Sequence, residues 1–411
     1  MIPPRIPAID AVRGFALLGI LLMNIVGFGL PGPAYEDPRA LGAATAADYA
    51  AWALAYVFAD GKMRGLFTML FGASLAILAD RAAADGGHPA AGHYRRMAAL
   101  LAIGLIHAWA IWYGDILVEY ALAGAILFPA WRWRPPALLY AAFLLTLASL
   151  LRSLDEWWGA IRLRALATEP GAAPAIVAQW RVATGDPAAQ VAADLAGYRG
   201  DLATVAAARW HDALALQADL PLFLIDTAGL VLLGIALLRL DYFTGWSTRA
   251  HLRVVAIGYG IGLPAMAGLA ALLLAGGFDP VDRRLATALA VPLRPAIALA
   301  YASTVILIVR AGIARRLVTR LAAAGRMALS NYLATSLVCT TLFYGTGLGL
   351  YGRLDRAALY LVVLPVWIAI LLWSKAWLGR FAMGPAEWLW RTLATGRSQQ
   401  MRRIDVATKS Q

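Results

Sequence analysis

Hydrophobic residues along this chain gather in long runs, separated by shorter stretches that hold most of the arginine, aspartate and proline. Runs of about 20 apolar residues are typical of helices that cross a membrane. The pattern therefore predicts an all-α, polytopic membrane protein with about ten transmembrane helices. The expected spans are 13–31, 64–79, 97–113, 116–131, 136–151, 218–238, 254–276, 288–309, 327–346 and 358–378.

Two segments depart from this pattern. The apolar stretch 46–59 ends at an interruption beginning with Asp60 and Gly61, so it either spans or lies in the membrane interface. Residues 152–217 carry several aspartates among alanines and are interpreted as two or three amphipathic helices on the outer surface. That segment either caps an outward-facing cavity or is a solvated insertion.

Composition supports membrane insertion. Hydrophobic residues make up 61% of the 411 and charged residues 15%, and a soluble core cannot absorb that much apolar surface. The formal net charge of +12 does not indicate nucleic-acid binding, because arginines in cytoplasmic loops explain it. Cys339 is the single cysteine, which excludes an intrachain disulfide and a cysteine-based metal site.

The basic residues also predict orientation. They concentrate in every second loop, as expected when those loops face the cytoplasm, and both termini then lie there too. The chain divides into a bundle of five spans at 1–151, an extracytoplasmic loop at 152–217, a second five-span bundle at 218–380, and a cytoplasmic interfacial helix with a tail at 381–411.

Polar side chains in the first span share one face. Asp10 stands one turn before Arg13 and can pair with it. Arg13 and Asn24 are separated by three turns and about 20° in azimuth. Ionisable groups at membrane depth are costly and are often functional. The alternative is a polar clamp to a neighbouring helix.

The third span repeats this arrangement. Arg96, with Arg95 beside it, stands at the cytoplasmic end, and His107 follows eleven residues later on the same face as Arg96. His107 is the one histidine inside an apolar span, and Asp115 follows in the next turn. An imidazole beside a carboxylate is a candidate general base. The alternative is a histidine that hydrogen-bonds across helices to hold the bundle.

The ninth span opens with Arg326, followed by Ser330 and Asn331. Each hydroxyl or amide alone is ordinary interhelical bonding. Taken together, however, the first, third and ninth spans each carry an arginine at the cytoplasmic end and a deeper polar group. This repetition predicts that an anionic ligand enters from the cytoplasm.

Several motifs are missing from the sequence. It contains no Gly-x-x-x-x-Gly-Lys-Ser/Thr phosphate loop and no Gly-x-Ser-x-Gly nucleophile elbow. It also has no histidine pair at metal-binding spacing, so no metal is expected. ATP-driven transport by this chain is therefore not expected.

Blocks along almost the whole chain resemble the YeiB-like family of bacterial inner-membrane proteins, which carry a domain of unknown function, DUF418. The matching blocks are DAVRG at 10–14 continuing to LLMN at 21–24, FTMLFG at 67–72, GLIH at 104–107, GDIL at 114–117, GRMALSNY at 325–332 and GPAEWLWR at 384–391. The resemblance implies a multi-pass protein of the bacterial inner membrane.

The opening Asp-x-x-Arg-Gly followed by Asn24 is more distantly similar to transmembrane acyltransferases. That similarity implies transfer of an acyl group from cytoplasmic acetyl-CoA or another acyl-CoA to an acceptor near the outer face. Asp10, Arg13, Arg95, Arg96, Arg326, Ser330 and Asn331 would then hold the CoA, and His107, Asp115 and Asn24 would be catalytic.

The expected partners are membrane lipids and a small-molecule, lipid or glycan acceptor, with a second copy of the chain as a candidate. Nucleic acid is not an expected partner. Two other functions stay open: a transporter or exporter of a small or lipid-like solute, and a non-catalytic membrane protein.

Overall fold

The computed structural model describes residues 6–402, and all regular secondary structure in that range is helical. Its one β-type contact is an isolated bridge between Phe381 and Arg402. The last part of the expected tail, 403–411, lies outside the described residues. The first helices are α1 (Pro7–Gly29), α2 (Ala46–Phe58), α3 (Lys62–Ala84), α4 (Pro89–Ile106), α5 (Leu117–Leu127) and α6 (Pro135–Thr168). The all-α prediction is confirmed.

The rest of the chain continues in the same way. The middle helices are α7 (Pro174–Thr184), α8 (Pro187–Tyr198), α9 (Leu202–Ala218), α10 (Leu220–Arg239), α11 (Thr248–Ile257) and α12 (Leu263–Ala275). The last are α13 (Pro280–Arg310), α14 (Arg315–Arg326), α15 (Ala328–Phe343), α16 (Arg356–Arg380) and α17 (Pro385–Thr395). Short 3₁₀ or π turns are η1 (Gly32–Tyr35), η2 (His107–Ile111), η3 (Phe128–Arg132) and η4 (Gly258–Gly262).

Within the described residues, seven helical stretches are long and apolar enough to cross a membrane. They are α1, α2 with α3, α6, α10, α11 with α12, α13 and α16. The remaining expected spans, 97–113, 116–131 and 327–346, fall on α4, α5 and α15, which are shorter. The structure therefore supports a helical membrane protein, while the number of ten spans stays a prediction.

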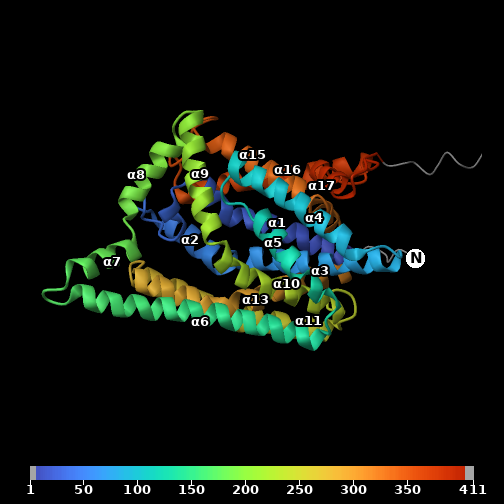
Figure 1. Cartoon of the computed structure of the whole chain (residues 1–411), viewed down its shortest axis with the longest axis horizontal. Helices are drawn as coiled ribbons and strands as arrows, with labels where there is room; N and C mark the ends of the chain where they lie inside the picture. Colours follow the sequence, from blue (N-terminus) through green and yellow to red (C-terminus); the bar gives the residue numbers. More distant parts are fainter. Residues whose placement is uncertain (1–5, 403–411) are drawn as a thin grey trace, which may run out of the picture.

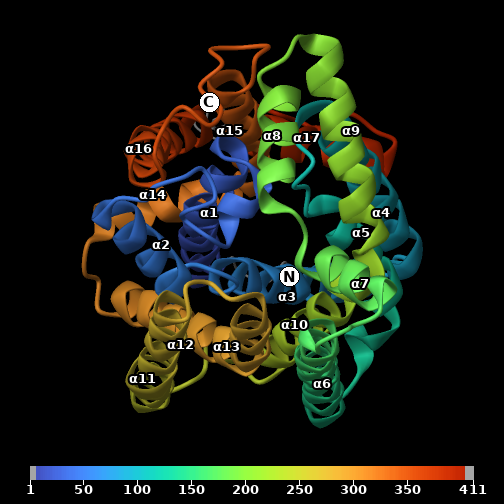
Figure 2. The same ribbon diagram turned by 90° about the vertical axis from the view of Figure 1, so that its left-hand side faces the viewer.

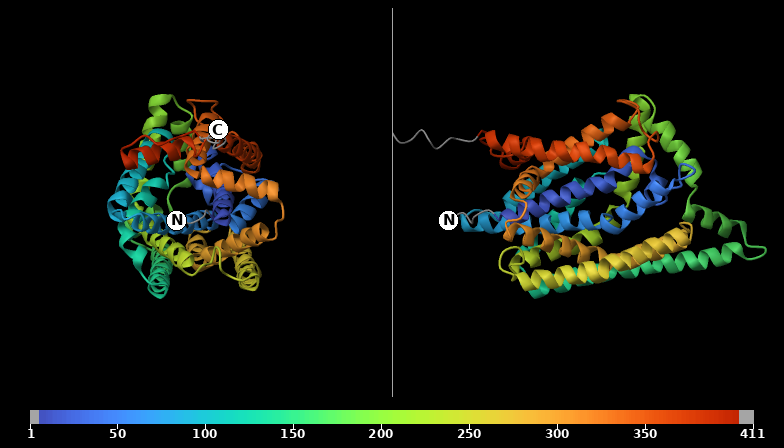
Figure 3. Two further views of the ribbon diagram at one scale, coloured as in Figure 1. Left: turned by 90° about the vertical axis from the view of Figure 1, so that its right-hand side faces the viewer. Right: turned by 180° about the vertical axis from the view of Figure 1, so that it is seen from behind.

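The long helices run side by side along the longest axis of the molecule (Figure 1). Helix α1 lies inside the bundle, where it packs against α3, α13, α14, α15 and α16 (Figure 2). In the apolar stretch of α1, 72% of the residues are buried inside the protein. The corresponding share for α6 is 22%, so most of the surface of α6 is left for lipid. The start of α1 and helix α17 lie at the same end of the bundle (Figure 3). We call this the Arg13 end and the opposite end the Tyr35 end.

Glycines allow the closest approach of α1 to its neighbour α14. A Cβ atom at Gly14 would stand 1.9 Å from the carbonyl oxygen of Leu321. On the other helix, a Cβ at Gly325 would stand 2.0 Å from the carbonyl oxygen of Asp10. The two backbones therefore touch where Asp10 and Arg13 are followed by Gly14, and no larger residue fits without separating the helices.

The segment expected on the outer surface folds as helices at the Tyr35 end (Figure 1). Helix α6 runs unbroken past residue 151 and through Gly159 to Thr168, and the next proline is Pro170. Helices α7, α8 and α9 follow. Helix α8 and its C-terminal cap Arg199 attach to the bundle through hydrogen bonds between side chains and backbone. The Gly32 amide donates to the Asp194 carboxylate at 2.8 Å, and Arg199 Nε donates to the Tyr351 carbonyl at 2.7 Å.

Candidate functional site

A cavity of about 500 Å³ opens at the Arg13 end of the bundle, between α1, α3, α15 and α17. We call it the Arg13 cavity. Its charged lining residues come from five helices, namely α1, α3, α10, α14 and α17. These residues are Asp10, Arg13, Asp80, Arg81, Arg239, Arg326, Glu387 and Arg391.

Several charges of the Arg13 cavity form pairs within the described residues. Arg13 contacts Asp10 at 3.3 Å and donates to the Ser74 hydroxyl at 2.7 Å. Arg239 holds both carboxylate oxygens of Asp80, at 2.6 and 2.8 Å. Counted over residues 6–402, the lining holds five arginines and three acids, an excess of two positive charges. A cleft with this balance, walled by apolar side chains, attracts anions.

The interior of the cavity is apolar. Its walls are formed mainly by Leu17, Ile20, Phe67, Phe71, Leu100, Leu117, Tyr120 and Tyr332. Pockets of this size suit molecules of drug-like dimensions, with polar groups fixing the orientation. The geometry therefore suits an amphiphilic ligand whose anionic part binds the arginines and whose apolar part lies deeper.

Glu387 links α17 to the start of α15. Its carboxylate accepts hydrogen bonds from the backbone amides of Leu329 at 2.8 Å and Ser330 at 3.2 Å, and from the Ser330 hydroxyl. Amides at a helix start are otherwise unpaired, and a carboxylate is favourable there. Burial raises the pKa of the Glu387 carboxyl, and these hydrogen bonds oppose that effect. Ser330 is engaged in this cap and does not line the cavity.

Asn331 lies outside the cavity as well. Its side chain is fully buried and donates to the Ala324 carbonyl and to Ser374, both at 3.0 Å. Its amide oxygen accepts a hydrogen bond from Trp373 Nε1 at 2.8 Å. The amide is thus saturated by α14 and α16, as expected for a group that holds helices together.

His107 and Asp115 form a buried pair close to the cavity. His107 Nδ1 lies 2.7 Å from Asp115, whose other oxygen accepts a hydrogen bond from the Val118 amide. His107 Nε2 is buried and has no hydrogen-bond partner among residues 6–402. The imidazole lies against the Tyr332 ring, with 4.9 Å between ring centroids. Since Tyr332 lines the cavity and His107 does not, one aromatic ring separates the histidine from it.

The structure brings three of the predicted residues into the cavity, namely Asp10, Arg13 and Arg326. Ile20 is the deepest residue of α1 that lines the cavity. Asn24 lies beyond it on the same helix, does not line the cavity and is half-buried. Arg95 is exposed on α4 and does not line the cavity. Arg96 is half-buried, and its backbone carbonyl accepts a hydrogen bond from Trp390 at 2.8 Å.

Sequence reasoning missed several lining residues. In the sequence, Arg81, Arg239 and Arg391 are among the basic residues that predict orientation, and no pattern singles out Asp80 or Tyr332 as site residues. The available signal was position: Arg81 and Arg239 each stand in the last turn of an apolar helix that ends on the side where α1 begins. Basic residues at such ends can line a common cavity as well as set orientation.

The fold defines a polytopic helical membrane protein, and its Arg13 cavity combines arginines at one end with apolar walls. The sequence pattern of the protein family of unknown function DUF418 matches residues 237–397. The chain is 35% identical to the uncharacterized protein YeiB of Escherichia coli, over 94% of this chain and 95% of that protein. It is 31% identical to the uncharacterized protein YxaH of Bacillus subtilis, with 94% of each covered.

The chain therefore belongs to the YeiB-like DUF418 family, as the motifs indicated.

Proposed function

We propose that the Arg13 cavity binds an acyl-CoA from the cytoplasm and that the protein transfers the acyl group to an acceptor near the opposite face. One observation carries this proposal: arginines gather at the mouth of a cavity whose interior is apolar. Guanidinium groups bind phosphates through paired, charge-assisted hydrogen bonds. The phosphates of CoA would bind at the mouth, and the acyl chain would lie along the apolar wall formed by α1.

The transfer needs a proton acceptor. A hydroxyl or amine of the acceptor attacks the thioester carbonyl, so a C–O or C–N bond forms and the C–S bond breaks. The proton leaves the acceptor through His107 Nε2 and ends on the CoA sulfur. Support for this role is that Asp115 holds the other ring nitrogen while Nε2 has no partner among the described residues. Asn24 would donate to the carbonyl oxygen.

Binding of acetyl-CoA to the purified full-length protein tests the cavity. Arg13→Gln removes a cavity charge, whereas Arg95→Gln removes an exposed charge from the same end outside the cavity. We expect Arg13→Gln to weaken binding roughly 10- to 100-fold, since hydrogen bonds to charged groups contribute about 1.5–3 kcal/mol. Arg95→Gln should bind like the natural chain. An equal loss in both variants, or no binding at all, would refute the proposal.

His107→Gln separates binding from chemistry. We expect this variant to keep acetyl-CoA binding and to lose the release of free CoA thiol by membranes that contain the protein. Unchanged thiol release would exclude His107 as the base while leaving the cavity as a binding site.

A transporter is the second candidate function, because a smaller cavity reaches α1 from the Tyr35 end. Ile20 lines the Arg13 cavity and Met23, one helical turn further, lines the smaller one. Two cavities that meet at one helix also suit the passage of a solute. Flux of a solute across vesicles in the absence of CoA would favour this function over acyl transfer.

A further inference from the structure

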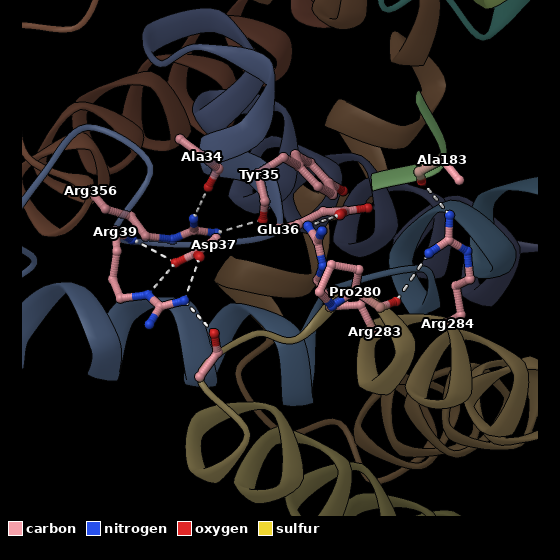
Figure 4. Close-up of polar contacts among 11 residues, drawn as sticks. Ala34, Tyr35, Glu36, Asp37, Arg39, Ala183, Pro280, Arg283, Arg284 and Arg356 are labelled. Carbon is pink, nitrogen blue, oxygen red and sulfur yellow. Dashed lines mark hydrogen bonds and ion pairs between the residues drawn. The ribbon is translucent and has the colours of Figure 1, made fainter. Parts of the chain in front are cut away.

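The smaller cavity, of about 100 Å³, lies between η1, α2, α13 and α16. We call it the Tyr35 cavity. Three arginines line it: Arg283 and Arg294 from α13, and Arg356 from the start of α16. Figure 4 shows Arg283 and Arg356 reaching the loop around Tyr35 and Glu36 from different helices.

One of the three arginines has no carboxylate partner. Arg283 pairs with Glu36 at 2.5 Å, and Arg294 pairs with Asp60 at 2.6 Å. Arg356 is 3% exposed, and its guanidinium donates to the backbone carbonyls of Ala34 and Tyr35 (Figure 4). No acid in the described chain forms an ion pair with it. Buried Asp48 acts on Arg356 electrostatically without forming an ion pair with it, and Asp48 does not line the cavity. Three arginines thus face two acids in the described lining, and an anion would stabilise the remaining buried positive charge.

Several residues that line the same cavity carry a buried hydrogen-bonding atom without a partner in the described chain. The Nε atoms of Arg283, Arg294 and Arg356 and the hydroxyl of Tyr56 are all buried, and none has a partner within residues 6–402. Buried polar atoms are paired in nearly all cases, and exceptions call for an explanation such as a bound ion. Guanidinium nitrogens only donate, so the partner that satisfies this set must be an acceptor. An oxyanion has that character.

We propose that the Tyr35 cavity binds an oxyanion, namely a carboxylate or phosphate group of a molecule that reaches the Tyr35 end. Its volume accommodates one such group and not a whole CoA. The site stands on its own contacts and does not depend on acyl transfer. Met23 of this cavity and Ile20 of the Arg13 cavity are about 4.5 Å apart along α1. A molecule anchored in the Tyr35 cavity therefore comes within one helical turn of the Arg13 cavity. An anionic acceptor of the acyl group would need to occupy that position.

Thermal unfolding of the full-length protein in detergent tests the site with inorganic phosphate and acetate as probes and chloride at matched ionic strength as the reference. We expect one of the two oxyanions to raise the unfolding temperature in a saturable way. A phosphate response assigns a phosphate group and an acetate response a carboxylate. If neither exceeds chloride, the proposal is overturned.

Three variants locate the response. Tyr56→Phe removes only an unpaired hydroxyl, so the anion-free protein should unfold as before while the anion binds roughly two- to tenfold more weakly. Arg356→Gln should weaken binding about tenfold or more. Arg39→Gln is the matched control, because Arg39 lies on the same face, is partly exposed and pairs with Asp37 outside the cavity (Figure 4).

The comparison remains decisive if one variant fails to fold. Because Arg356 also holds the loop at Ala34, its variant can unfold for structural reasons, and Tyr56→Phe and Arg283→Gln then carry the test. A response that stays at natural strength in Tyr56→Phe and Arg283→Gln, or falls equally in Arg39→Gln, would place the anion elsewhere and overturn the site.

Discussion

The crossing of α1 and α14 gives a sharp prediction for Gly14→Ala. The added Cβ would lie 1.9 Å from the Leu321 carbonyl oxygen, and real Cβ atoms essentially never approach closer than 3.0 Å. The two helices must therefore move apart by about 1 Å. Inserting a methyl group into a packed contact of this kind costs about 1–3 kcal/mol. Arg13 is the preceding residue, so the movement also changes the position of a cavity arginine relative to Ser74 of α3.

The matched control is Gly268→Ala in α12, where an added Cβ meets nothing within 4 Å. Alanine favours a helix over glycine by up to about 1 kcal/mol, so this variant should be as stable as the natural chain or more stable. Tryptophan fluorescence during heating of the detergent-purified proteins measures the difference. Equal unfolding temperatures for the two variants would show that α1 and α14 do not touch at Gly14, and the reasoning would fail.

Two further predictions concern polar groups at the start of α15. Asn331→Leu leaves Trp373 Nε1 and Ser374 without their amide partner, and unpaired buried groups cost about 1–3 kcal/mol each, so we expect a loss of about 2–5 kcal/mol in unfolding experiments. An unchanged stability would contradict this role. For Glu387, burial raises the pKa of the carboxyl. The folded protein therefore binds the proton more tightly than the unfolded chain does. As a consequence, stability falls as pH rises from about 4.3 through the raised pKa. Glu387→Gln should remove that fall in a pH series of unfolding temperatures, and a variant with the same pH profile as the natural chain would refute it.

The class of the protein and part of its site follow from the amino-acid sequence. Apolar runs are too long for a soluble core, and the helical membrane class follows from that property alone. The pairing of Asp10 with Arg13 was also predictable, because helical geometry places residues three apart on one face. The motif blocks led to the YeiB-like family, which the relatives confirm.

Which polar groups meet depends on how the helices pack against one another. Helical periodicity sets the direction of a side chain about its own axis but not the rotation of that helix against its neighbours. Arg326 and Asn331 both stand near the junction of α14 and α15, yet Arg326 lines the cavity and Asn331 turns to Ser374. The cavity brings Arg81 and Arg239 close to Arg13 because α3 and α10 end where α1 begins. This arrangement depends on packing between distant segments, so no local sequence pattern predicts it.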